Sequence, residues 1–90
     1  MSVKINIPNF LYHLTDNQDV VEVKGNTVGQ CLKELVDRFP GLRGWLFGKN
    51  GSLNKTVDVY VNMESAYPEE LAKPVKDGDE LHIIIIISGG

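Results

Sequence analysis

The sequence is poor in cysteine and has no long apolar run. Cys31 is its single cysteine, so no disulfide can form within the chain. The amino terminus lacks the apolar stretch of a signal peptide. The apolar run from Ile83 to Ile87, even with the nearby Leu81, is far shorter than the roughly 20 residues of a membrane-spanning helix. We therefore expect a cytoplasmic protein with no membrane partner.

An excess of positive charge is also missing. The chain has 9 lysine and arginine residues against 12 aspartate and glutamate residues, which gives a net charge of −3. A nucleic acid backbone or an anionic membrane would repel such a protein. We expect no nucleic acid partner, and a protein partner with a basic groove fits better.

Patterns that bind metals are absent from the sequence. His13 and His82 do not have the spacing of metal ligands. Asp77, Asp79 and Glu80 stand around a glycine, which is the composition of an ordinary tight turn. We expect this chain to bind no metal and no cofactor of its own.

Two further side chains could carry a function. Cys31 lies inside a predicted helix without an identifiable activating group, so we expect a buried or bystander thiol. Trp45 follows a glycine and is either an exposed anchor for a partner or a side chain that packs over the helix end.

Four segments of this 90-residue chain are predicted to be strands. Three alternate apolar and polar residues with a period of two. Their apolar positions are Val3, Ile5 and Ile7, then Val21 and Val23, then Val57, Val59 and Val61. The fourth segment, 81–87, is apolar on both faces, so we expect it in the centre of the sheet. The first two strands should pair as a loose hairpin across residues 9–18.

One main helix is predicted after the second strand. Thr27 and Gln30 have the spacing of a capping box, which begins a helix. Apolar residues then recur at helical spacing up to Phe39, and Pro40-Gly41 ends the pattern. Residues 42–47 add one further helical turn before a loop at 48–52. The stretch 63–76 lacks periodicity, and we expect turns and at most a short helical piece there.

The predicted order is therefore strand, strand, helix, strand, strand. This is an α+β chain with a β-grasp (ubiquitin-like) fold, a mixed sheet of about four strands with one helix packed across one face. Residues 1–88 form the domain, and 89–90 form an exposed tail. The last strand should run parallel to the first, so that the tail leaves from one end of the sheet.

The two faces of the last strand predict a docking surface. Leu81, Ile83, Ile85 and Ile87 continue one apolar row, which we assign to the core beneath the helix. His82, Ile84 and Ile86 then lie on the open face, where exposed apolar side chains favour partner binding. The alternative is that loop 63–76 covers them. We expect His82, Ile84, Ile86 and Ser88 to contact a partner.

The chain ends in Gly89-Gly90. Two glycines form a slender tip with maximal backbone freedom, which leaves the terminal carboxylate accessible to an enzyme with a narrow channel. The alternative is a frayed terminus or a remnant of cloning.

An ordered set of motifs now resembles the MoaD/ThiS group of ubiquitin-like sulfur carriers over nearly the whole chain. The set consists of Ile7-Pro8, Phe10-Leu11, Leu14-Thr15, Thr27-Val28-Gly29, Leu32, Leu35, Phe39-Pro40-Gly41-Leu42-Arg43, Val59-Tyr60-Val61-Asn62, Lys76-Asp77-Gly78-Asp79-Glu80-Leu81 and Gly89-Gly90. The insertion at 48–55 resembles the longer MoaD-like and CysO-like members.

The resemblance implies a carrier protein that is the substrate of other enzymes and not a catalyst. A partner enzyme would adenylate the Gly90 carboxylate with ATP and magnesium, and a sulfur donor would convert it to a thiocarboxylate. Gly89 would be the required slender neighbour. The chain has no Walker-type phosphate loop, so ATP and magnesium belong to the partner.

The resemblance leaves the destination of the sulfur open. Molybdopterin synthesis ranks first, with a larger synthase subunit as the sulfur-accepting partner. Cysteine synthesis ranks second and thiazole formation third. Two alternatives of another class are a ubiquitin-like protein modifier, which forms isopeptides on lysines, and a β-grasp interaction module with an incidental glycine ending.

Two positions depart from the family pattern. Many members have proline before the final glycines, whereas this chain has Ile84, Ile85 and Ile86, so the strand is expected to extend further toward the tip. Members often have glycine after the Val-Asn pair, whereas here Met63 follows Asn62. Because methionine tolerates a positive φ poorly, we expect that turn to differ.

Overall fold

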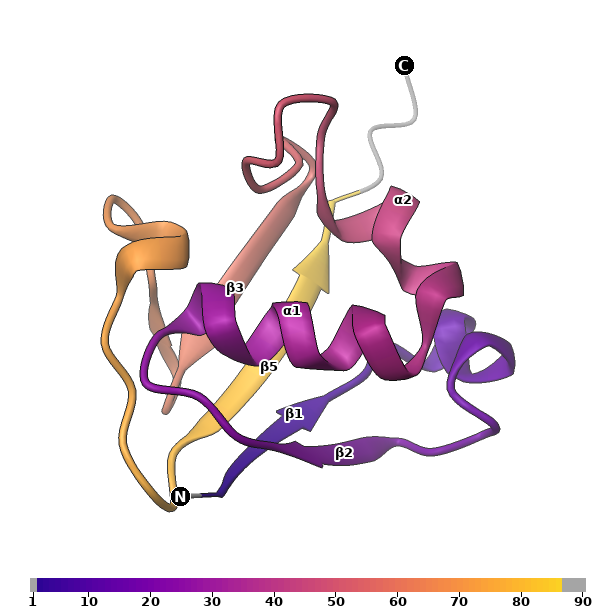
Figure 1. Cartoon of the computed structure of the whole chain (residues 1–90), viewed down its shortest axis with the longest axis horizontal. Coiled ribbons are helices and arrows are strands. Elements are labelled where there is room, and N and C mark those ends of the chain that lie inside the picture. The colour runs from indigo at the N-terminus through magenta and orange to yellow at the C-terminus, as the bar shows by residue number, and fades with distance from the viewer. Residues whose placement is uncertain (1, 87–90) are drawn as a thin grey trace.

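A computed structural model describes residues 2–86 of the chain. Its mixed sheet has five strands in the order β2-β1-β5-β3-β4. The strands are β1 (Val3–Asn6), β2 (Val20–Val23), β3 (Val57–Val61), β4 (Glu64–Ser65) and β5 (Glu80–Ile85). Helix α1 (Val28–Arg38) lies across one face of this sheet (Figure 1). The predicted β-grasp fold is confirmed.

Strand β5 lies in the centre of the sheet, as its two apolar faces predicted. It pairs in parallel with β1, where Ile5 is opposite Leu81, and antiparallel with β3, where Val59 is opposite Ile83. The strand is therefore held by hydrogen bonds on both sides. Its carboxyl end lies at the same edge of the sheet as the carboxyl end of β1.

Helix α1 begins at the predicted cap. The Thr27 side chain accepts a hydrogen bond from the Gln30 N–H at 3.1 Å, and the Gln30 side chain in turn accepts one from the Asn26 N–H at 2.7 Å. The returning bond thus reaches one residue further back than in a standard capping box. After α1 come the 3₁₀ helix η2 (Pro40–Leu42) and the short helix α2 (Arg43–Leu46), which is the predicted extra turn.

The hydrophobic core lies between α1 and the sheet. Val3, Ile5, Val59, Leu81 and Ile83 are among the buried side chains from the sheet. From the helices, the buried set includes Val28, Leu32, Leu35, Val36 and Leu46. Burying one such side chain contributes about 1.5–3 kcal/mol.

Three short elements were not specified by the sequence. The connection between β1 and β2 contains the 3₁₀ helix η1 (Asn9–Leu14). The aperiodic stretch after β3 contains β4 and the 3₁₀ helix η3 (Glu70–Ala72). The expected short helical piece is therefore η3, and β4 adds a fifth strand at the edge of the sheet.

The expectation that methionine would avoid a positive φ in the turn after β3 was wrong. Asn62 has φ 49° and Met63 has φ 73°, so both residues adopt the left-handed conformation despite the methionine. Pairing of Val61 with Glu64 leaves only these two residues for the turn, and such two-residue turns require positive φ. The Asn62 side chain also fixes the turn, because it accepts a hydrogen bond from the Glu80 N–H at 2.9 Å. Strand pairing thus overrides the local preference of methionine.

Candidate functional site on the open sheet face

The sheet face opposite α1, called the open face here, carries two exposed isoleucines near the carboxyl end of β5. Ile84 is 44% exposed and Ile86 is 60% exposed. Leu81 and Ile83 are buried, and Ile85 is partly buried against the core. The predicted assignment of the two faces is confirmed for these residues. Segment 63–76 therefore leaves both isoleucines accessible.

A polar pair lies beside Ile84. Asp58 on β3 is opposite Ile84, and its carboxylate accepts a hydrogen bond from the Ser65 hydroxyl at 2.9 Å. This hydrogen bond joins β3 to the edge strand β4. An apolar strip beside a fixed carboxylate suits a partner that offers both apolar and basic groups.

His82 is less accessible than the two isoleucines. It lies between Asn6 on β1 and Tyr60 on β3 in the strand register, and it is half-buried. Its Nδ1 atom is buried and has no hydrogen-bond partner within residues 2–86. Direct contact between His82 and a partner remains a prediction.

Backbone pairing continues one residue beyond β5. The Ile86 N–H donates to the Thr56 carbonyl at 2.7 Å, so the described chain is held to the sheet up to that residue. Ser88, Gly89 and Gly90, the predicted contact and the activated terminus, lie outside the described residues, as does Ile87.

The other residues singled out in the sequence have structural surroundings. Cys31 is buried, and burial together with the nearby Glu34 and Asp79 carboxylates raises the pKa of its thiol to about 11. The prediction of a buried thiol is confirmed. Trp45 is 40% exposed and packs edge-on against Phe10 of η1, with ring centroids 5.7 Å apart. Its role as an anchor for a partner stays a prediction.

Asp79 lies at the other end of β5 and is buried. Its carboxylate accepts hydrogen bonds from the Asn62 side-chain amide at 2.8 Å and from the Lys76 N–H at 2.9 Å. These bonds lower the pKa of Asp79. The acidic turn around Gly78 is thus held in place by these hydrogen bonds. Within residues 2–86, no group of three or more potential metal ligands occurs, and no helix has the length and apolar character to cross a membrane.

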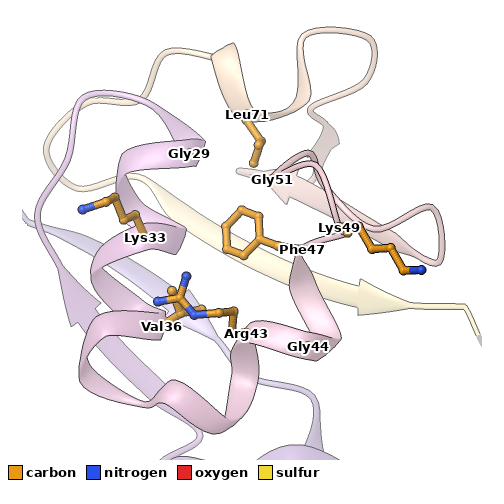
Figure 2. A pocket seen from close by; sticks show the side chains of 10 residues that line it. Gly29, Lys33, Val36, Arg43, Gly44, Phe47, Lys49, Gly51 and Leu71 are labelled. Atoms are coloured by element: carbon orange, nitrogen blue, oxygen red, sulfur yellow. The ribbon is translucent and has the colours of Figure 1, made fainter.

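A groove on the helix side was not foreseen from the sequence. It has a volume of about 690 Å³ and lies between α1, α2, the loop after α2 and η3. Figure 2 shows the Phe47 ring at its centre, with Lys33 and Lys49 on opposite sides in this view. Its basic residues come from α1, α2 and the loop after α2 and form no local motif, so no sequence signal pointed to it.

Comparison with known proteins gives consistent matches over this fold. The model of the ThiS family matches residues 5–90. The sulfur carrier protein CysO of Mycobacterium tuberculosis (strain CDC 1551 / Oshkosh) is 31% identical over 93 residues, which cover 100% of both chains. Small archaeal modifier protein 1 of Haloferax volcanii is 38% identical over 71 residues, 78% of each chain. CysO in the solved BexX/CysO complex of Amycolatopsis orientalis superposes with a TM-score of 0.88 and 34% identity, covering 98% of this chain and 99% of that one.

Proposed function

This chain belongs to the ThiS family, and from that membership we propose that it is a sulfur carrier protein whose Gly90 carboxylate is converted to a thiocarboxylate. The observation that carries the proposal is the end-to-end match: the family model extends to residue 90, and a protein named as a sulfur carrier aligns over its full length. The described part of the chain supports it with a central strand that leads toward the terminus.

The proposed chemistry takes place at the terminus of this chain, in the active sites of partner enzymes. A carboxylate oxygen of Gly90 would attack the α-phosphorus of ATP and displace pyrophosphate, which gives an acyl adenylate. Sulfide supplied by a donor would then attack the carbonyl carbon and displace AMP, which leaves a thiocarboxylate and releases a proton. The carrier contributes a terminus without side chains, which fits a narrow channel, and a folded body by which the enzyme holds it.

The open face is the proposed docking surface for the adenylating enzyme. Ile84 and Ile86 are exposed beside the end of the strand that leads to Gly90. A partner seated on them would therefore lie next to Ile86, the last described residue before the tail. The CysO of Amycolatopsis orientalis was solved in complex with another protein, BexX, so a relative of this fold does bind a protein partner.

For the destination of the sulfur, we propose a CysO-type pathway ahead of molybdopterin synthesis. The resemblance of the motifs alone ranked molybdopterin first. Two of the three relatives reported above carry the CysO name, each at more than 30% identity over nearly the whole chain. Thiazole formation remains third.

A protein modifier is the second candidate function. It is favoured by the match to a relative named as a small archaeal modifier protein. A modifier would use the same activated carboxylate but transfer Gly90 to a lysine amine. Tryptic digests of cellular proteins separate the two, because only a modifier leaves remnants of this tail on lysines.

The experiment for the carrier function is mass spectrometry of the intact protein after incubation with adenylating enzymes, ATP and a sulfide source. We expect an oxygen-to-sulfur mass increase that fragmentation assigns to Gly90. If enzymes that thiolate a control CysO leave this chain unchanged, the carrier function is wrong.

A further inference from the structure

The groove on the helix side is separate from the open face. The lining includes Lys33, Arg43, Phe47, Lys49 and Leu71. Helix α1, which lines the groove, covers one face of the sheet (Figure 1), whereas Ile84 and Ile86 are exposed on the opposite face. A molecule bound in the groove would therefore leave the open face free.

The groove is basic although the chain as a whole is acidic. Lys33, Arg43 and Lys49 line it, and no carboxylate is among the lining residues. Asp37 contacts both Lys33 and Arg43, at 3.7 and 3.8 Å, but all three side chains are well exposed and such pairs bind weakly. One carboxylate shared by two cations leaves a net positive charge in a protein of net charge −3.

The floor of the groove is apolar. Phe47 and Leu71 are only partly buried, and both pack against the core. Lys33 lies on one side of the Phe47 ring and Lys49 on the other, while Arg43 extends from α2 toward α1 (Figure 2). The cations therefore do not converge on one point, as a site for a single phosphate would require. A ligand that meets all three must span the apolar floor.

Gly44 lines the groove without a side chain, and no neighbouring atom requires glycine at this position. A Cβ atom at this position would have no heavy atom within 4 Å, and the residue lies in α2. Glycine is disfavoured in a helix by up to about 1 kcal/mol relative to alanine. Gly29 differs, because its Cβ would lie 3.0 Å from the Leu71 carbonyl oxygen. Packing accounts for Gly29, whereas nothing packed against Gly44 requires glycine, and a side chain there would reduce the space in the groove.

We propose that this groove binds an acidic, extended peptide segment of a partner protein. An apolar side chain of the segment contacts Phe47 and Leu71, and carboxylates on both sides of it meet Lys33, Arg43 and Lys49. The inference goes beyond the carrier function and does not depend on it, because it uses no residue of the open face or tail. Two partners can then bind the chain at once, one on each side.

The test is an NMR titration of the ¹⁵N-labelled full chain with a short synthetic peptide of glutamates around a central leucine. We expect amide shifts centred on Lys33, Arg43, Phe47 and Leu71, and an affinity that falls as salt is added. The same peptide with glutamine in place of glutamate should bind far more weakly.

Two variants and one control make the test decisive. The double variant Lys33→Glu/Arg43→Glu should weaken binding at least about tenfold, the effect of roughly 1.4 kcal/mol. The control, Lys24→Glu/Lys55→Glu, has the same net charge and exposed sites outside the groove, and it should retain most of the affinity. Gly44→Leu should fill the groove and remove binding while the fold stays intact.

Three results would overturn the proposal. One is the absence of shifts with the acidic peptide. Another is equal weakening by the groove variant and its control. The third is concentration-dependent broadening of groove amides in the free protein, which would make a second copy of the chain the occupant. Thiocarboxylation of Gly90 is measured separately, so failure here leaves the carrier function standing.

Discussion

The two ends of β5 are built in opposite ways. At the start of the strand, Asp79 is buried and its carboxylate accepts two hydrogen bonds, while the Asn62 side chain accepts one from the Glu80 N–H. The Asp79 carbonyl also accepts a bond from the Lys4 N–H at 3.1 Å. At the far end, the Ile86 N–H donates to Thr56, and the side chains of Ile84 and Ile86 are exposed.

This difference separates stability from binding along one strand. Polar groups at the start of β5 are satisfied within the fold, so changes there should alter the free energy of unfolding. Apolar groups at the far end leave surface that only a partner can bury, so changes there should alter binding with little effect on stability. The predictions below test that separation.

Deletion of Gly89-Gly90 should have the largest effect. We expect complete loss of thiocarboxylate formation, because the enzyme loses the terminus that it activates. The melting temperature should remain that of the intact chain, since residues 2–86 contain the described core. Intact mass measures thiocarboxylate formation, and thermal unfolding measures the melting temperature. Continued sulfur incorporation in the truncated chain would show that the diglycine is incidental.

Ile84→Lys should abolish binding of the adenylating enzyme with a small effect on stability. Lysine places a charge in the apolar strip, whereas Asp58 directly opposite offers it a favourable partner within the sheet. Aspartate at this position would face Asp58 instead and destabilise the strand pair, so lysine is the cleaner substitution. Binding can be followed by calorimetry.

Val20→Lys is the matched control for this change. Val20 is 38% exposed on the edge strand β2, which β1 separates from β5. We expect the control to bind normally. Equal loss of binding in both variants would mean that the docking surface is not localised at the end of β5.

Asp79→Asn should lower stability by about 1–3 kcal/mol, because the amide cannot accept both hydrogen bonds that the carboxylate accepts. Denaturant unfolding measures the loss. Thiocarboxylation well below the melting temperature should be unchanged. If the activity fell while stability did not, the proposed separation between the two ends of β5 would be wrong.

The pH dependence of unfolding tests the same carboxylate. The folded state lowers the pKa of Asp79, so its contribution is fully present above the ordinary aspartate pKa of about 3.9. It is lost as the pH falls from there through the folded pKa. The intact chain should therefore lose more stability than Asp79→Asn below about pH 4.

The sequence predicted the elements whose residues repeat with a clear period. Alternation identified β1, β2 and β3, the apolar spacing identified α1, and the order of elements implied the parallel pairing of β1 with β5. Isoleucines occupy both faces of β5, so the two faces could be assigned only by counting alternate residues from Leu81. That assignment placed Ile84 and Ile86 correctly on the open face.

Other features depend on contacts between distant residues. The two residues of β4 are too short for a pattern, and their position follows from pairing with β3. The groove joins Lys33, Arg43 and Lys49 from three elements. Met63 was misjudged because its conformation is set by the pairing around it and not by its own preference.

Met63→Gly should give the smallest effect, a gain in stability of up to about 1 kcal/mol. Methionine at φ 73° carries the left-handed strain of about 1–2 kcal/mol that glycine avoids, while the greater freedom of glycine in the unfolded chain offsets part of this gain. Glu64→Gly in β4 is the control. It adds the same conformational freedom to the unfolded chain without relieving a positive φ, so it should lower the free energy of unfolding. Met63 lies near the hydrogen-bonded start of β5 and not near its exposed end, so the gain in stability should leave partner binding unchanged. A change in binding from this turn would show that the start of the strand also takes part in recognition.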